Sequence, residues 1–142
     1  MTGAENTAED TAVPDGGPSV LDASAVLAWL RAEPGAQVVD EHLTGAVLCA
    51  VNLAEVHQKL AQHGVDADRA IARLRTLGIR IEPLDTADAT IAAKPWPTTR
   101  AAGLSLGDRC CLALAARLGG PAITADQAWT GLDLNVTVIA IR

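Results

Sequence analysis

Short apolar runs alternate with helix-patterned segments along most of the chain, and no hairpin turn joins one run to the next. The runs lie at residues 19–22, 46–50, 120–126 and 135–141, and residues 79–84 alternate apolar with charged side chains. Parallel strands need a long crossover between them, usually a helix, whereas antiparallel strands can be joined by a short turn. The alternation therefore predicts an α/β domain, with a short, mostly parallel central sheet that helices cover on both faces.

The same pattern gives approximate bounds for the helices. They are expected at residues 23–33, 36–43, 52–64, 66–78, 85–93 and 105–118, with a short helix or turn at 127–132. The alternating segment 79–84 is placed at an edge of the sheet, because charged side chains there can remain in water. Residues 1–18 are small, polar and acidic, which predicts a disordered tail ahead of a single domain over residues 19–142.

Composition narrows the class of partner. The net charge is −6, but four of the acids lie in the first seventeen residues, so the rest of the chain carries about −2. These acids are Glu5, Glu9, Asp10 and Asp15. That balance is compatible with a phosphate-bearing substrate without requiring one. Phe and Tyr are absent, which argues against the base-stacking platforms of single-strand-binding proteins, and Trp29 and Trp129 are expected in the core or in dimer packing.

The apolar stretches and the cysteines indicate a cytoplasmic location. The longest uncharged apolar stretch, residues 45–54, is too short to span a bilayer, and the first residues are acidic where a secretory signal is basic. Cys49 stands alone and Cys110 adjoins Cys111, so the chain has neither an even disulfide framework nor a CxxC pair. Reduced thiols are expected, with Cys49 in the core.

Four acids lie where a strand-like run meets a helix. Asp22 and Asp126 close two of the runs, and Glu55 and Asp108 are expected in the first turns of two helices. In open α/β sheets, ligands bind beyond the carboxyl ends of the strands, near the point where the strand order reverses. The positions of these acids therefore predict a shared acidic site.

Each of these acids also has a purely structural interpretation as a helix cap. Asp22 and Asp126 can be N-caps, and the segments 52–55 (NLAE) and 105–108 (SLGD) both fit the capping box. Ser or Thr would serve equally well in most caps. Capping alone therefore does not explain why all four elements present a carboxylate at the same edge of the sheet.

Four segments in this order and spacing resemble the PIN-domain ribonucleases, in particular the VapC-type toxins of bacterial toxin–antitoxin pairs. They are VLDASAVLAWL, AVNLAEV, GLSLGDRCCLALA and AITADQAW, and the similarity extends over residues 20–142. The resemblance implies a three-layer PIN-like fold and a metal-dependent endoribonuclease that cuts tRNA or another structured RNA and so inhibits translation and growth. It further implies homodimers and a cognate antitoxin that blocks the site.

The resemblance also assigns roles to individual residues. By motif match, the acidic quartet consists of Asp22, Glu55, Asp108 and Asp126, with Ser24, Asn52 and Thr124 as supporting polar neighbours. Cys49 departs from the pattern, because such proteins often carry Ser before the helix of the second acid. That change affects a helix cap and touches no expected ligand.

Phosphodiester cleavage requires the kinds of residue that the quartet supplies. Mg²⁺ and Mn²⁺ take oxygen ligands, and they can activate water and stabilise charge on phosphate and on the leaving alkoxide. Asp22, Asp108 and Asp126 are predicted to bind the metal, with Glu55 completing the site or orienting the attacking water. Ser24 and Thr124 would orient ligands through hydrogen bonds. Without metal, mutual repulsion should raise the pKa of at least one of these carboxyls.

Two other function classes remain open. A Mg²⁺-dependent phosphatase would use Asp22 as nucleophile, although that chemistry normally wants a second acid two residues later, where this chain has Ser24. A non-catalytic RNA- or protein-binding module would use the quartet as caps. The chain has no GxGxxG after a strand and no GxxxxGK[ST], which disfavours dinucleotide and nucleotide-triphosphate binding by such loops.

The remaining polar residues are given structural interpretations. The histidines lack an HExxH pattern and are expected to face solvent: His42, His57 and His63. Asp88 and Asp133 are interpreted as surface or capping residues. The arginines of the segment 66–78 are interpreted as a solvent-exposed face in preference to an RNA-binding surface. The helix that bears them could also frame a groove for an antitoxin segment, together with residues 26–30.

Overall fold

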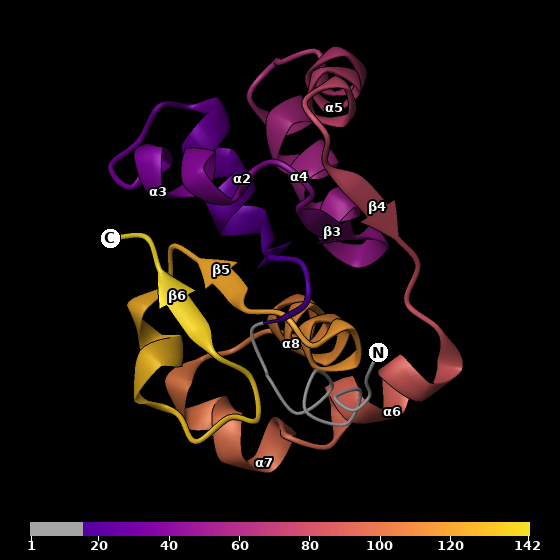
Figure 1. Cartoon of the computed structure of the whole chain (residues 1–142), viewed down its shortest axis with the longest axis vertical. Coiled ribbons are helices and arrows are strands. Elements are labelled where there is room, and N and C mark those ends of the chain that lie inside the picture. Colours follow the sequence, from indigo (N-terminus) through magenta and orange to yellow (C-terminus); the bar gives the residue numbers. More distant parts are fainter. Residues whose placement is uncertain (1–15) are drawn as a thin grey trace, which may run out of the picture.

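A five-stranded parallel sheet forms the centre of the protein (Figure 1), whose structure is a computed structural model that describes residues 16–142. The strands are β2 (Val20–Leu21), β3 (Val47–Cys49), β4 (Arg80–Glu82), β5 (Ala122–Thr124) and β6 (Val138–Ala140). Their order is β4-β3-β2-β5-β6, and every neighbouring pair is parallel. The predicted parallel sheet is confirmed, and so is the edge position of β4.

The strand order reverses between β2 and β5. From β2 the chain proceeds outward through β3 to β4, and it then returns to the other side of β2 to form β5 and β6. The carboxyl ends of β2 and β5 lie side by side, with Val20 paired to Ala122 and Leu21 to Ile123. This pair of strand ends is therefore the place where an open α/β sheet binds its ligands.

Helices cover both faces of the sheet, as the alternation predicted. On one face lie α2 (Ala23–Leu30), α3 (Ala36–His42), α4 (Ala50–Gln62) and α5 (Ala67–Thr76), in the upper half of Figure 1. On the other lie α6 (Thr86–Ala93), α7 (Trp96–Thr99), η1 (Arg100–Ala102) and α8 (Leu106–Leu118). The short helix η2 (Gln127–Gly131) follows β5 and completes the second layer with the fully buried Trp129. Its burial confirms the core position expected for this tryptophan.

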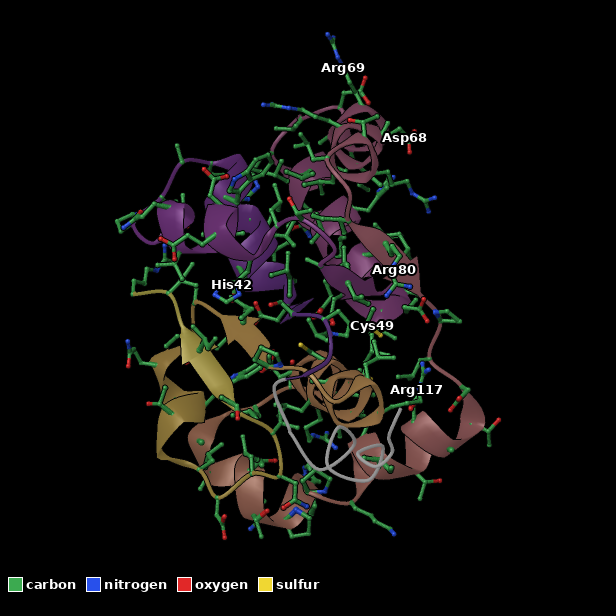
Figure 2. All side chains as sticks on the ribbon, viewed as in Figure 1. His42, Cys49, Asp68, Arg69, Arg80 and Arg117 are labelled. Atoms are coloured by element: carbon green, nitrogen blue, oxygen red, sulfur yellow. The ribbon has the colours of Figure 1, made fainter. Side chains whose placement is uncertain are left out.

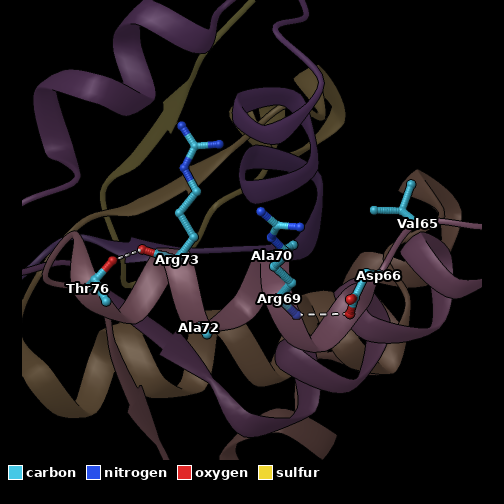
Figure 3. A pocket seen from close by; sticks show the side chains of 7 residues that line it. All are labelled: Val65, Asp66, Arg69, Ala70, Ala72, Arg73 and Thr76. Atoms are coloured by element: carbon cyan, nitrogen blue, oxygen red, sulfur yellow. Dashed lines mark hydrogen bonds between the residues drawn. The ribbon is translucent and has the colours of Figure 1, made fainter.

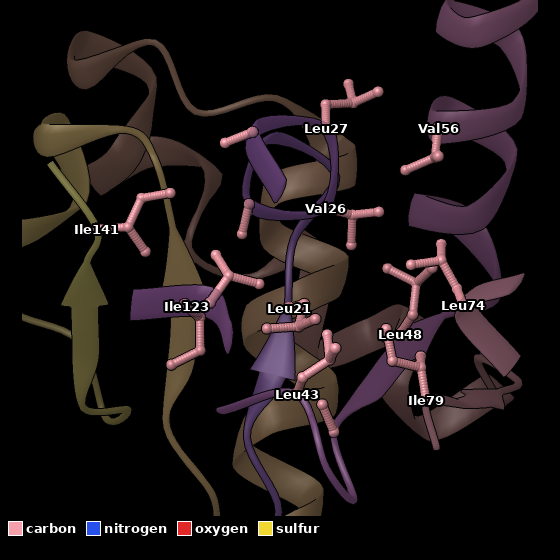
Figure 4. Packing of buried hydrophobic residues seen from close by; sticks show 14 of the residues in the cluster. Leu21, Val26, Leu27, Leu43, Leu48, Val56, Leu74, Ile79, Ile123 and Ile141 are labelled. Atoms are coloured by element: carbon pink, nitrogen blue, oxygen red, sulfur yellow. The ribbon is translucent and has the colours of Figure 1, made fainter. Parts of the chain in front are cut away.

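The alternation of side chains along each strand divides the core into two clusters. Leu21, Leu48 and Ile123 point to the α2 and α4 face, where Figure 4 shows them packed with residues of those helices. The preceding residues of the same strands point to the α8 face. Because both faces of these strands are buried, the strands consist almost entirely of apolar residues.

Several local expectations require correction. Helix α4 begins at Ala50 instead of Asn52. A short helix that was not among those predicted, α7, begins after Pro95 and has Pro97 within its first turn, where a missing N–H costs little. His42 is half-buried and hydrogen-bonded to Ser19 at 2.9 Å, so only the other two histidines face solvent as expected. Cys49 is fully buried, as predicted.

The predicted acidic tail lies mostly outside the described residues. Residues 1–15 are not described, and at the end of the tail the Gly17 N–H donates to the Gly119 carbonyl at 2.8 Å. Gly17, within the predicted tail, thus contacts the residue that ends α8. Within residues 16–142, no helix is both long and apolar enough to cross a membrane.

Candidate active site

All four acids of the quartet line one pocket of about 390 Å³. The pocket lies beyond the carboxyl ends of β2 and β5, where Asp22 directly follows β2 and Asp126 lies two residues beyond β5. Glu55 reaches it from α4 and Asp108 from the first turn of α8. The four carboxylates, separated by up to 104 positions in the sequence, are thus brought together by the fold, as the sequence predicted.

Asp22 is the buried member of the quartet, with 3% of its surface exposed. As N-cap of α2, its Oδ1 accepts from the Ala25 N–H at 2.8 Å. The hydroxyl of Ser24 donates to Oδ1 at 2.7 Å, and the hydroxyl of Thr124 donates to Oδ2 at 2.6 Å. Ser24 Oγ also lies 2.9 Å from Oδ2, so each carboxylate oxygen is within hydrogen-bond distance of two donors.

The environment of Asp22 favours its neutral form. Burial raises the pKa of the Asp22 carboxyl to about 6, against the lowering effect of its three hydrogen-bond donors. The nearby charge of Asp108 raises it further. Within the described part of the chain, no cation forms an ion pair with Asp22. A raised pKa was predicted for at least one of the carboxyls and is found at Asp22, but burial contributes more to it than the predicted repulsion between carboxylates.

Two hydroxyls connect the ends of β2 and β5. Thr124 is fully buried, and its Oγ1 accepts from the Asp126 N–H at 3.0 Å while it donates to Asp22. The Oγ of Ser24 accepts from the Ala125 N–H at 2.9 Å. Each hydroxyl thus binds Asp22 on one strand and the backbone on the other. Both fix the relative position of the two strand ends, which suits the supporting role predicted for them.

Glu55 and Asn52 lie differently from the prediction. Because α4 begins at Ala50, Glu55 is in its second turn and Asn52 is no N-cap; the N-cap is Cys49, whose side chain forms no capping bond. The buried Asn52 instead donates from Nδ2 to Glu55 Oε1 at 2.7 Å and to the Gly107 carbonyl at 3.0 Å. It thereby connects Glu55 to the start of α8.

A glycine gives the Glu55 carboxylate its place against α8. A Cβ at Gly107 would lie 2.5 Å from Glu55 Oε2, so any side chain at this position would displace the carboxylate. The acid therefore enters the pocket because residue 107 has no side chain. The NLAE pattern at residues 52–55 is an inter-helix contact rather than a capping box.

Asp108 caps α8 and also belongs to the pocket. The predicted capping box is confirmed, with Asp108 Oδ2 accepting from the Ser105 N–H at 2.8 Å and Ser105 Oγ accepting from the Asp108 N–H at 3.1 Å. Burial raises the pKa of the Asp108 carboxyl, and the charge of Asp126 adds to this effect. Asp126 is exposed and caps η2 through a 2.9 Å bond from the Ala128 N–H. Capping and membership of a site are therefore compatible in the same residue.

The donor set suits a hard cation that retains several waters. All four side chains offer carboxylate oxygens, which Mg²⁺ and Mn²⁺ prefer. Among the described residues, however, no three His, Cys, Asp or Glu side chains are placed to hold one ion between them. Mg²⁺ is commonly held by one or two carboxylates, with waters and substrate phosphates completing the shell. The quartet fits that form of binding and does not form a closed protein cage.

The pocket also contains cations that the sequence analysis did not identify. They are Arg31, Lys59 and Arg142, together with a fifth acid, Glu33. Arg142 Nη1 donates to Glu33 Oε1 at 3.1 Å, which joins the chain end to the segment after α2. The sequence could have indicated Lys59, because it follows Glu55 by one helical turn and so lies on the same face of α4. The two arginines come from distant segments and carry no comparable signal.

A larger hollow of about 520 Å³ lies along α5, away from the quartet (Figure 3). It is lined by residues 65–76 alone, and the bonds drawn there are the Asp66 cap of α5 and a bond from Thr76 to a backbone carbonyl. Asp68 and Arg69 point outward from this helix (Figure 2). All the arginines of α5 are exposed, as predicted, and Arg73 lies 5.6 Å from the ring centre of the half-buried Trp29. This hollow holds no group suited to bond cleavage.

Comparison with known proteins agrees with this geometry. The family model described as PIN domain matches residues 19–133. The chain shares 16% identity with a chain of the toxin–antitoxin complex from Klebsiella pneumoniae, covering 87% of this chain and 98% of that one with a TM-score of 0.69. A chain of FitAB bound to IR36 DNA fragment is 25% identical, with coverages of 87% and 94% and a TM-score of 0.62.

A third solved structure has the same fold. A chain of VapBC2 from Rickettsia felis, bound to a DNA fragment from its promoter, shares 10% identity, with coverages of 86% and 97% and a TM-score of 0.65. No curated protein sequence matches the chain.

Proposed function

Because this chain belongs to the PIN domain family, we propose that it is a divalent-metal-dependent endoribonuclease and the toxin of a toxin–antitoxin pair. The observation that carries the proposal is the convergence of four carboxylates in one pocket at the reversal point of the sheet. The likeness to chains of toxin–antitoxin complexes supports the second part. A cognate antitoxin and a second copy of this chain are the proposed protein partners, and tRNA or another structured RNA is the proposed substrate.

In this proposal, Asp22, Asp108 and Asp126 would hold Mg²⁺ or Mn²⁺, in part through waters that the ion retains. When bound, the ion supplies charge stabilisation at the phosphate and at the leaving oxygen and lowers the pKa of water. Asp22 would offer a carboxylate oxygen to the ion, while Ser24 and Thr124 keep the carboxylate from rotating. Glu55, fixed by Asn52, orients the attacking water or accepts its proton. The water oxygen bonds to phosphorus as the bond from phosphorus to the leaving ribose oxygen breaks.

The two alternatives fit the geometry less well. A phosphatase nucleophile at Asp22 would need an accessible carboxylate, whereas this one is 3% exposed and hydrogen-bonded at both oxygens. The second acid of that chemistry is replaced by Ser24, whose hydroxyl is engaged with Asp22. A non-catalytic module would gain nothing from a buried carboxyl whose pKa is raised.

Cleavage by the purified protein, freed of any co-purifying partner, tests the proposal. Total RNA and purified tRNA are incubated with Mn²⁺, with Mg²⁺ and with EDTA, beside Asp108→Asn and a matched control, Asp68→Asn, on the exposed face of α5. We expect metal-dependent products that the control retains and Asp108→Asn loses. Equal cleavage by the two variants would overturn the role of the quartet. Absence of both cleavage and calorimetric Mn²⁺ binding would leave Asp22, Asp108 and Asp126 as helix caps only.

A further inference from the structure

Arg109 is a buried cation on α8 that pairs with no acid among residues 16–142. Only 8% of its surface is exposed, and its Nη1 donates to the Ala92 carbonyl at 2.8 Å. Its Nε is buried without a hydrogen-bond partner, and no described carboxylate forms an ion pair with this arginine. Buried charges are normally paired, because an unpaired one loses hydration without compensation.

The second arginine of α8 shows what such pairing looks like in this fold. Arg117 lies two turns further along the helix and is labelled in Figure 2. It donates from Nε to both Asp88 oxygens at 3.0 Å and from Nη2 to the Pro83 carbonyl. Its Nε edge is thus bound to a carboxylate. Arg109 has the corresponding Nε edge free of any described partner, since its one protein bond uses Nη1.

Arg109 lines a cavity of about 460 Å³ between α6, α8 and the segment before β6. The walls are mainly apolar, with Ile91, Leu112, Leu134 and Val136 among them. Lys94 adds a second positive charge, against the single carboxylate of Asp133. The volume is within the range of small-molecule sites, which are typically apolar with a few placed polar groups.

We propose that this cavity binds a small carboxylic acid with a short apolar body. The carboxylate would accept hydrogen bonds from Arg109, whose planar guanidinium matches a carboxylate with two parallel bonds. The apolar body would lie against Leu112, Leu134 and Val136. A single negative charge balances the cavity, which carries two cations and one acid. The proposal is independent of the nuclease assignment, since none of the cavity's lining residues belongs to the quartet.

Calorimetric titration of the full chain with hexanoate, acetate and hexanol tests the carboxylate and the apolar body separately. We expect hexanoate to bind with a dissociation constant of roughly a millimolar, the scale for a ligand of so few atoms. Acetate should bind about tenfold or more weakly, because it lacks the apolar body. Hexanol should not bind measurably, because it lacks the carboxylate.

Three variants locate the binding. Arg109→Met should weaken hexanoate binding about tenfold or more, and Arg109→Lys should weaken it less because the charge remains while the paired geometry is lost. Arg69→Met, an exposed arginine on α5, is the matched control and should bind as the unmodified protein does. Asp108→Asn should also bind normally, which separates this cavity from the acid pocket. Circular dichroism checks that each variant is folded.

Two outcomes overturn the proposal. One is equal hexanoate binding by the unmodified protein and folded Arg109→Met. The other is the absence of hexanoate binding to the unmodified protein. If, in that case, Arg109→Met also loses self-association in sedimentation, a carboxylate of a second copy pairs with Arg109.

Discussion

Asp22 and Asp88 are both buried carboxyls at helix starts, with 3% and 1% of their surfaces exposed, yet their surroundings differ in one respect. Asp88 receives two 3.0 Å bonds from Arg117 and forms the capping box of α6 with Asp85. Asp22 is held by hydroxyls and one N–H, with no described cation. The pKa of Asp88 is accordingly lowered, mainly by the hydrogen bond from Arg117 against the cost of burial, and that of Asp22 is raised to about 6 by burial.

The difference indicates that Asp88 stabilises the fold, whereas Asp22 is suited to bind a cation. The Arg117 guanidinium neutralises the Asp88 carboxylate, so Asp88 requires no bound cation. Asp22 retains the cost of burial with no compensating cation in the described part of the chain, and a bound cation would offset that cost. The two acids therefore predict opposite responses to the same substitution, to pH and to metal.

Asp22→Asn should produce the largest effect, on activity. We expect a loss on the order of 10³-fold in metal-dependent RNA cleavage, the scale on which one catalytic group acts. The free energy of unfolding of the metal-free protein at pH 7 should not fall, because the substitution removes a buried charge. Cleavage rates and urea unfolding of the same samples give both quantities. If Asp22→Asn unfolds more easily and cleaves RNA normally, Asp22 stabilises the fold, as Asp88 does, and has no role in cleavage.

The raised pKa of Asp22 should appear in the pH dependence of the free energy of unfolding. In EDTA, the folded state keeps a proton up to about pH 6 that the unfolded chain releases near pH 4. The stabilising contribution is therefore complete below pH 4 and is lost as the pH rises through 6. The loss amounts to about 3 kcal/mol, because one pKa unit corresponds to about 1.4 kcal/mol.

Urea unfolding between pH 4 and 7 measures this contribution as the difference between the unmodified protein and Asp22→Asn. Saturating Mg²⁺ should abolish the difference in slope by lowering the pKa of Asp22. Identical pH profiles of the two proteins in EDTA would show that Asp22 is ionised throughout this range.

Asp88→Asn should have the smaller, purely structural effect. Removing the carboxylate weakens the bonds from Arg117 and the α6 cap, with an expected loss of about 2 kcal/mol and a melting temperature lower by roughly 5–10 °C. Cleavage by the folded protein should be unchanged. Differential scanning calorimetry checks the stability, with the exposed Asp133→Asn as control. A loss of activity without a loss of stability would place Asp88 in the catalytic machinery.

Part of the fold and of the site was readable from the sequence because the patterns are local. The alternation of apolar runs and helical segments specified a parallel sheet with two helical layers, and residues 79–84 indicated an edge strand. Strand ends followed by acids indicated where Asp22 and Asp126 would lie, because parallel strands end at the same edge. The SLGD capping box was visible at Asp108, since a cap involves only four consecutive residues.

Other features depended on contacts between distant segments. NLAE reads as a capping box, but Asn52 binds Gly107 instead, a residue 55 positions away. Asp88 reads as a surface or capping residue, and only the packing of α6 on α8 shows that it is also buried and paired with Arg117. Arg109 follows an acid in sequence, and nothing local indicates that it lies buried with no acidic partner among the described residues.

The sequence by itself determined the type of fold, the order of its elements and the identity of the four acids, because these follow from the spacing of side chains along one segment at a time. Tertiary structure alone decided which buried charges are neutralised. Whether Asp88, Asp22 or Arg109 has a partner depends on which side chain an adjacent element places within about 3 Å, and hydrogen-bond geometry is not encoded in the spacing of either segment.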